Sequence, residues 1–276
     1  MATAAPPVYV PAPPVTPSRY GLLSAADIIP ITDPHTRNGV QYQTAPDGPA
    51  HLSFAECVNG KGDDRSDDVT DGLPWTEAGP IVVYNGFVCR AVGLSDDERQ
   101  QYARDALAGG EAAAVEKAIW ATADPLRLME TGLTDILSAT PVSVVAGIAM
   151  LERQLGNAGV GVGVIHAPRE VAPHAAAKAQ IESDGARKVT VLGTRWAFGA
   201  YPTTDPDGVQ AASNVAWMVA TGPVVARRTE VVIRPTTYQQ AFDQRNNDVF
   251  SVAERTWVIG WDDRVRAAVP VTLPTT

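Results

Sequence analysis

The sequence predicts an α+β fold, and three observations support this prediction. Residues 94–120 carry apolar side chains at helical spacing, residues 140–222 alternate between helix and strand patterns, and the tail from residue 214 onward shows strand patterns alone. Side chains repeat every 3.6 residues in a helix and every 2 residues in a strand, so the period separates the two kinds of element. The chain should therefore combine one long helix, an α/β module and a terminal set of strands.

The composition limits the classes of function. The chain has 276 residues, of which 45% are apolar, and a net charge of -9 from 22 Lys plus Arg and 31 Asp plus Glu. Such an acidic chain argues against a generally basic surface for nucleic acid. The two cysteines, Cys57 and Cys89, form no CxxC motif or disulfide framework and favour a reduced setting. We find no signal-peptide pattern and no apolar run long enough to span a bilayer, which predicts a soluble protein.

The N-terminal segment is rich in proline. Six prolines lie within residues 1–17 and favour an extended, partly polyproline II arm with no core of its own. Such an arm is either disordered or packed on a neighbour. The apolar residues Val8, Tyr9 and Val10 favour the second alternative and make these residues candidates for an interface.

A projecting β-hairpin should follow the arm. The strand-like pieces NGVQYQ and AHLSFAECV lie within residues 38–58, and GPIVVYNGFVCRAV follows at 79–92. Between them runs the polar stretch NGKGDDRSDDVTDGLPWTEA, whose acidic part lacks the Gly and Glu positions of the common calcium loop. We expect a solvated loop with Trp75 near the tip of the hairpin.

The longest helix should lie in LSDDERQQYARDALAGGEAAAVEKAIW. Ser95 and Glu98 match a capping box, and about 24 helical residues would span roughly 35 Å. A second helix is predicted from the N-cap Thr140 and Pro141 to Gly156. The strand GVGVGVIHA, a short helix near Pro173 and the strands RKVTVLG and TRWAFGA complete an α/β module that ends at about Gly222.

The tail should form a long β-ribbon. Pairing PVVARRTEVVI with DVFSVAERTWVIGWD can place Arg228 opposite Glu254, and opposite charges across strands are favourable. Phe250 and Val252 lie on the even face of the second strand, whereas Trp257 and its neighbours at 259 and 261 lie on the odd face. Because side chains alternate in a strand, we expect the buried face to switch near Glu254 and Arg255.

The sequence contains no specific catalytic, cofactor-binding or metal-binding motif. In GNAGVGVG the glycines follow a helix and open a strand, which is the reverse of a dinucleotide site. A nucleophile elbow, a P-loop and an HExxH motif are all missing. His166 and His174 are eight residues apart across a predicted strand-to-helix junction, which is typical of ordinary structural histidines.

The order of parts resembles the major capsid protein of tailed bacteriophages, which has the Hong Kong 97-type fold shared with encapsulins. The stretches ARRTEVVI, AFDQRNN and DVFSVAERTWVIGWDDRVRAAVPVTL look like the end of such proteins, and FVCRAVG, AVEKAIW and VIHAPREVA look like actinobacterial phage shell proteins. The resemblance implies four parts, listed here in chain order: an N-terminal arm (1–37), an extended loop (38–93), a peripheral domain with the spine helix (94–139 and 223–276) and an axial domain (140–222).

The resemblance also implies a function. It predicts a non-enzymatic subunit, without cofactor, that forms pentamers and hexamers in an icosahedral virion shell around double-stranded DNA held without sequence-specific binding. Scaffolding, portal and decoration proteins are the implied partners, with no membrane involved and assembly in the host cytoplasm. In some capsids of this fold a lysine of the extended loop is joined to an asparagine of a neighbour, for which Lys61 and Asn246 or Asn247 are candidates.

Other functions stay open at this point. They are an encapsulin-type compartment shell, another head or tail protein of a virion, and a small α/β enzyme, which would need a pocket with converging polar groups. The residues expected at interfaces between subunits are Val8, Tyr9, Val10, Trp75, Arg228, Glu254, Arg255 and Trp257.

Overall fold

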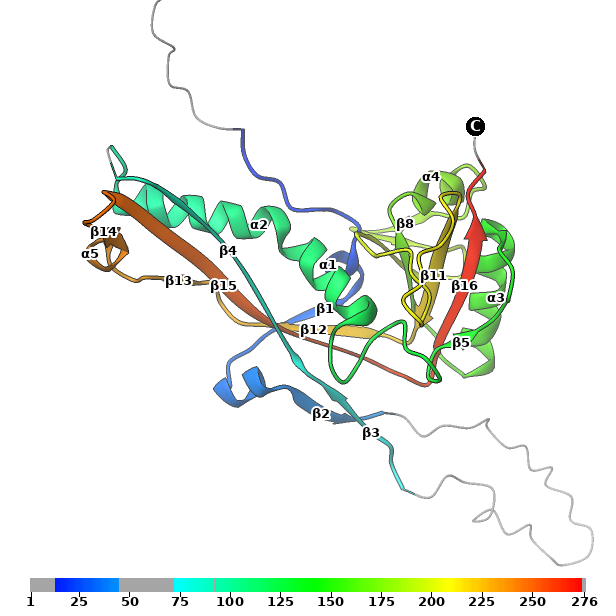
Figure 1. The fold of residues 1–276 in the computed structure, drawn as a ribbon. Helices are drawn as coiled ribbons and strands as arrows, with labels where there is room; N and C mark the ends of the chain where they lie inside the picture. Colours follow the sequence, from blue (N-terminus) through cyan, green and yellow to red (C-terminus); the bar gives the residue numbers. More distant parts are fainter. Residues whose placement is uncertain (1–12, 45–71, 92, 275–276) are drawn as a thin grey trace, which may run out of the picture.

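The fold is mixed α+β and has an elongated half and a compact half (Figure 1). The computed structural model describes residues 13–44, 72–91 and 93–274. Val8, Tyr9, Val10, the segment AHLSFAECV and Lys61 lie outside these residues, so the expectations attached to them stay predictions.

Helix α2 (Asp96–Ala121) is the longest helix and runs along the elongated half (Figure 1). It begins as the sequence predicts. The Ser95 hydroxyl accepts a hydrogen bond from the Glu98 backbone N–H, and the Glu98 carboxylate accepts one from the Ser95 N–H. This capping box is confirmed, and it satisfies two of the backbone donors that a helix N-terminus leaves unpaired.

A six-stranded sheet lies along α2, and its longest strand is β15 (Asp248–Trp261). Strand β4 (Pro80–Arg90) pairs antiparallel with β15 from Arg90 opposite Asp248 to Pro80 opposite Val258. The other strands are β1 (Asp27–Pro30), β12 (Val224–Arg228), β13 (Val232–Arg234) and β14 (Phe242–Asp243). The short helix α5 (Tyr238–Ala241) lies between β13 and β14.

The face of β15 that packs against α2 does not switch, so that prediction is wrong. Val249, Ser251 and Ala253 are buried, as are Trp257 and other odd-numbered residues, whereas Phe250 on the even face is exposed. Small side chains at 251 and 253 leave room for the helix, so the odd face stays covered along the strand. Beyond residue 257 the even face is covered as well, because Tyr42 packs against Gly260.

An eight-stranded sheet forms the compact half. Its central strands are β16 (Arg266–Thr272), β11 (Val215–Thr221), β7 (Val164–Pro168) and β10 (Arg195–Gly199). Its outer strands are β5 (Asp135–Ile136), β6 (Val142–Ser143), β8 (Glu182–Asp184) and β9 (Arg187–Val189). Two helices belong to this half, α3 (Val144–Asn157) and α4 (Val171–Ala176).

Two details of the compact half differ from expectation. Helix α3 is capped by Ser143, whose hydroxyl accepts from the Ala146 N–H, and not by Thr140, because residues 142–143 form a strand beside β16. The resemblance assigned the range 223–276, which includes β16, to the same domain as the long helix. Strand β16 pairs instead with β11 over seven residues, so it belongs to the compact half.

The hairpin of the extended loop is formed by β2 (Val40–Gln43) and β3 (Trp75–Ala78). Strand β4 follows β3 directly but leaves the hairpin to pair with β15. A 3-10 helix, η1 (Pro34–Asn38), precedes β2, and the short helix α1 (Leu22–Ala25) precedes β1.

Two apolar clusters lie on opposite faces of the eight-stranded sheet. One contains Ala197, Val219 and Ala268 together with residues of α1, α2 and β15. The other contains Ile165 and Met218 and packs under α3 and α4. The first cluster runs from the elongated half into the compact half and so joins the two halves, whereas the second lies within the compact half.

Candidate functional site

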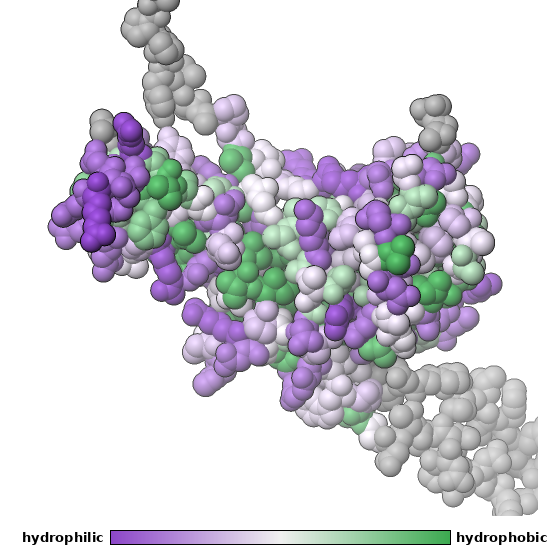
Figure 2. Space-filling view, in the orientation of Figure 1, coloured by the Kyte–Doolittle hydropathy of each residue, from purple (hydrophilic) through white to green (hydrophobic). Residues whose placement is uncertain are grey.

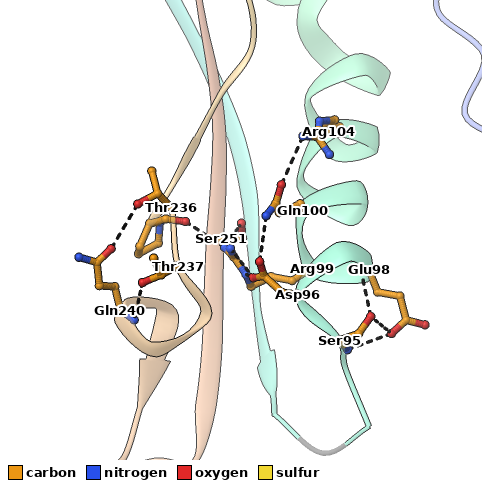
Figure 3. Close-up of polar contacts among 11 residues, drawn as sticks. Ser95, Asp96, Glu98, Arg99, Gln100, Arg104, Thr236, Thr237, Gln240 and Ser251 are labelled. Carbon is orange, nitrogen blue, oxygen red and sulfur yellow. Dashed lines mark hydrogen bonds and ion pairs between the residues drawn. The ribbon is translucent and has the colours of Figure 1, made fainter.

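The beginning of α2 is fixed to β15 by a buried arginine (Figure 3). Arg99 is fully buried; it donates through Nε to Asp96 Oδ1 at 2.8 Å and through Nη1 to Ser251 Oγ at 2.9 Å and to the Pro235 carbonyl at 3.2 Å. The hydrogen bond and charge of Arg99 lower the pKa of the Asp96 carboxyl. Arg99 therefore joins the first turn of the helix, the long strand and the loop before α5.

A second anchor lies near the middle of α2. The Glu111 carboxylate accepts from Arg255 Nη1 at 3.0 and 3.2 Å and from the indole Nε1 of Trp257 at 2.7 Å. The side chains of Glu111 and Arg255 are only 11% and 14% exposed, and Trp257 is fully buried. In this structure Trp257 is buried in the core and Arg255 is largely covered by Glu111, while their place at an interface between subunits stays a prediction.

The pairing of Arg228 with Glu254 expected from the sequence is wrong. Arg228 lies opposite Trp257, with its guanidinium carbon 5.7 Å from the ring centre, and Glu254 lies opposite Val232. The partner of Glu254 is Arg234, at 2.6 Å. A cation over an indole ring is also favourable, so the charges alone did not fix the register.

A third anchoring residue of α2, Glu116, joins the two halves of the molecule. Glu116 is 1% exposed, and its two carboxylate oxygens accept from the backbone N–H groups of Leu22 (2.9 Å) and Ala200 (2.7 Å). Burial raises the pKa of Glu116, an effect that these two hydrogen bonds and the charge of Arg169 partly oppose. Its spacing of three and four residues from the buried Ile119 and Trp120 places it on the covered face of α2, which is the signal in the sequence that could have indicated its burial.

His166 is a structural histidine in this arrangement. It is fully buried, with Nδ1 3.0 Å from the Tyr201 hydroxyl and Nε2 3.0 Å from the Thr221 hydroxyl. Burial lowers its pKa to about 3. Both ring nitrogens are therefore occupied by neutral partners.

The face of the β4–β15 ribbon opposite α2 carries an exposed apolar stripe, defined here as Val82, Tyr84, Val88 and Phe250. Their exposed fractions are 56%, 71%, 69% and 41%, and Val88 lies directly opposite Phe250. Trp75, a predicted interface residue, is 64% exposed on β3. Hydrophobic side chains reach the surface of both halves of the molecule (Figure 2). Exposed apolar patches of this kind mark sites of association.

The described residues form no metal-binding cluster and leave an open hollow beside the hairpin. They include no group of three or more His, Cys, Asp or Glu side chains that could hold a metal ion. A hollow of about 310 Å³ at the base of the hairpin is lined by Tyr42, Val225, Arg227 and Gly260, among others, and is open to solvent. No helix among the described ranges is both long and apolar enough to cross a membrane.

Comparison with known proteins finds its matches among solved structures. No protein-family model and no curated protein matches the chain. The capsid of Helicobacter pylori bacteriophage KHP30 matches with a TM-score of 0.56 at 8% identity, over 98% of this chain and 96% of that chain. The capsid of a native GTA particle matches with a TM-score of 0.54 at 11% identity, over 99% and 96%.

A solved encapsulin structure is also similar to this chain. The holo-SrpI encapsulin complex from Synechococcus elongatus matches with a TM-score of 0.53 at 12% identity, over 99% of this chain and 95% of that chain. These matches extend over nearly the whole chain and include both halves of the molecule. The chain has the Hong Kong 97-type fold of phage capsid and encapsulin shell proteins.

Proposed function

We propose that this protein is the major capsid subunit of a tailed bacteriophage and assembles in many copies into an icosahedral head. The observation that carries the proposal is the full-length likeness to capsid structures, one of which was computed with fivefold symmetry. Repeated contacts between different surfaces of identical copies close into rings and shells. The apolar stripe and Trp75 are surfaces that such contacts would cover.

In this proposal the subunit forms part of the shell wall and does not catalyse a reaction of a substrate. Its acidic charge suits a shell that encloses DNA loosely, because few cations are available to bind phosphates. Scaffolding, portal and decoration proteins would be its partners in the head, and assembly would take place in the host cytoplasm. A bond from Lys61 to Asn246 or Asn247 of a neighbour also remains part of this proposal.

An encapsulin-type shell is the second candidate, favoured by the likeness to the encapsulin complex. The two candidates differ in what the particle contains. Purified particles should be treated with nuclease and protease, opened, and analysed for protected DNA and for a second protein. Protected double-stranded DNA supports the phage head, whereas a co-purifying enzyme without DNA supports the compartment.

Assembly itself is tested with the stripe. Tyr84 is 71% exposed, so Tyr84→Asp should leave the subunit folded but place a charge where a neighbour packs. The control, Tyr84→Phe, keeps the apolar ring. We expect megadalton particles from the parent and from Tyr84→Phe by sedimentation velocity, and a 29 kDa species from Tyr84→Asp with unchanged circular dichroism. If Tyr84→Asp still forms particles, the stripe is not part of an interface between subunits. If the parent protein is a monomer under all conditions, the proposal of a shell is contradicted.

The N-terminal arm is the second assembly element of this proposal. Truncation of residues 1–30 would not test it cleanly, because Leu22 and Ala25 are buried in the core and β1 pairs with β12. Removal of residues 1–12 spares these contacts. We expect this shorter truncation to leave thermal stability unchanged and to reduce the yield of particles, whereas a normal yield would show that the arm is dispensable.

A further inference from the structure

Residues 18–31 cross from one half of the molecule to the other, and we refer to them as the clasp. At one end the Ser18 hydroxyl accepts from Arg169 at 2.7 Å, and the Tyr20 carbonyl accepts from the Phe198 N–H at 2.6 Å. The Lys188 ammonium lies 5.1 Å from the centre of the Tyr20 ring. This end is therefore held by the eight-stranded sheet and the loop that follows β7.

The other end of the clasp belongs to the six-stranded sheet. Strand β1 pairs in parallel with β12, and the Ile31 N–H donates to the Arg228 carbonyl at 2.7 Å. Between the two ends Asp27 forms ion pairs with Arg187 and Arg195, and Arg195 also donates to the Ala25 carbonyl at 3.0 Å. The clasp thus contacts both sheets through polar groups.

Glu116 of α2 holds the centre of the clasp. Its carboxylate accepts from the Leu22 N–H in the clasp and from the Ala200 N–H after β10. A Cβ added at Gly21 would lie 2.1 Å from the carboxylate, and one at Gly199 would lie 2.4 Å from it. Two glycines therefore let two backbones approach one acid, and neither position tolerates a larger residue without moving Glu116.

The halves are also connected on the other side of their junction. The chain passes from β11 to β12 through Gly222 and Pro223, and from β15 to β16 through residues 262–265. These two connections are joined to each other, because the Gly222 N–H donates to the Asp262 carbonyl at 3.0 Å and the Asp262 N–H to the Pro223 carbonyl at 3.1 Å. Figure 1 shows α1 between α2 and the compact half, with the two connections below it. Such short paired connections are places where sheets rotate relative to each other.

We infer that the clasp is a locally opening strap that locks the angle between the two sheets, and that Glu116 is the residue that keeps it closed. The clasp is the part of the N-terminal arm that directly follows the proline-rich residues 1–17, so a contact made by those residues would reach the junction through Ser18 and Tyr20. This device belongs to the single subunit and holds whether or not the subunit builds a shell. The clasp buries Leu22, Ala25 and Ala26, whereas Ile28 and Ile29 are exposed. A segment with so few buried apolar side chains can open without global unfolding.

The test is hydrogen exchange, measured by mass spectrometry on the full-length protein. Glu116→Gln keeps the side-chain volume but leaves one acceptor oxygen and places an amide donor against a backbone N–H. We expect exchange in residues 20–31 to become about 10- to 100-fold faster, with exchange in α3 and β7 unchanged. The matched control is Glu152→Gln on α3, because Glu152 accepts from the hydroxyls of Thr190 and Thr194 and has no hydrogen bond to the clasp.

Each outcome decides the inference. Faster exchange confined to the clasp supports it, whereas unchanged exchange, or an equal increase in α3 and β7, overturns it. If Glu116→Gln does not fold, Asp27→Asn provides the second test, because Asp27 is half-exposed and its ion pairs with Arg187 and Arg195 lie between the two ends of the clasp. That variant should raise exchange in the clasp about threefold and nowhere else. Failure to form particles would not affect either result, since exchange is compared between variants in the same state of assembly.

Discussion

Replacing Glu111 by alanine should destabilise the subunit more than any surface change. The substitution removes three hydrogen bonds at once, two from Arg255 and one from the Trp257 indole. A buried charge left without its partner costs about 3–5 kcal/mol, and an unpaired buried N–H about 1–3 kcal/mol. Arg255 keeps 14% of its side-chain exposure, and water can enter the space left by the acid, so the two costs do not add in full. We expect a loss of about 3–4 kcal/mol in the free energy of unfolding.

The assay is urea unfolding of the unassembled subunit, followed by tryptophan fluorescence. A double-mutant cycle with Arg255→Met isolates the ion pair, because methionine keeps much of the volume and removes the charge. Once the charge is gone, the additional cost of Glu111→Ala should fall to about 1–2 kcal/mol, which reflects the unpaired indole. The control is Glu254→Ala, whose partner Arg234 is 67% exposed, with an expected cost below about 1 kcal/mol. A cost below about 1 kcal/mol for Glu111→Ala, or no coupling to Arg255, would refute the argument.

Two further predictions follow from the site. In double-mutant cycles of unfolding free energy, Arg228 and Glu254 should show no coupling, whereas Arg234 and Glu254 should show a coupling of a few tenths of a kcal/mol. The reverse result would contradict the register of β13 and β15. His166 has a folded-state pKa of about 3 against 6.5 when unfolded, so the unfolded state binds more protons between these values. Stability should therefore fall as the pH drops below 6.5, with a contribution from His166 of up to about 1.4 kcal/mol per pH unit. In urea unfolding at pH 7, 5 and 4 the fall should be smaller in His166→Asn, and the remainder comes from carboxyls with a lowered pKa such as Asp96. An unchanged fall in His166→Asn would contradict this reasoning.

The order of elements could be predicted from the sequence, because it rests on local patterns. The capping box at Ser95 and Glu98 fixed the start of α2, and the short helix and the strands of the compact half also appear where their periods place them. The partners of these elements could not be predicted in the same way. The segment at 80–90 has apolar residues on both faces, so its pattern does not tell that Val83 is buried and Tyr84 is exposed.

The errors on β15 have one physical origin. Large apolar residues were taken as the buried ones, yet Phe250 faces outward and Ser251 is buried, because a helix that packs closely needs small side chains beneath it. The stripe that includes Phe250 was missed for the same reason. In a subunit of a larger assembly, an apolar residue can be buried in the subunit core or against a neighbouring subunit. A single sequence does not distinguish these two kinds of burial.

The polar residues buried along α2 explain how a helix with few large side chains keeps one position on its sheets. Much of its buried face is small or aliphatic, as at Ala103, Leu107 and Val115, and such a face can shift along a strand at little cost. Arg99, Glu111 and Glu116 cannot shift, because each must meet fixed donors or acceptors or remain buried and unpaired. Their partners lie on β15 and in the clasp, so the three residues fix the helix at its start, its middle and its junction with the compact half. Their helical spacing places them on the same face as Ala103, Leu107 and Val115, which signals burial, but the sequence does not show the partners, such as a backbone N–H 94 positions away.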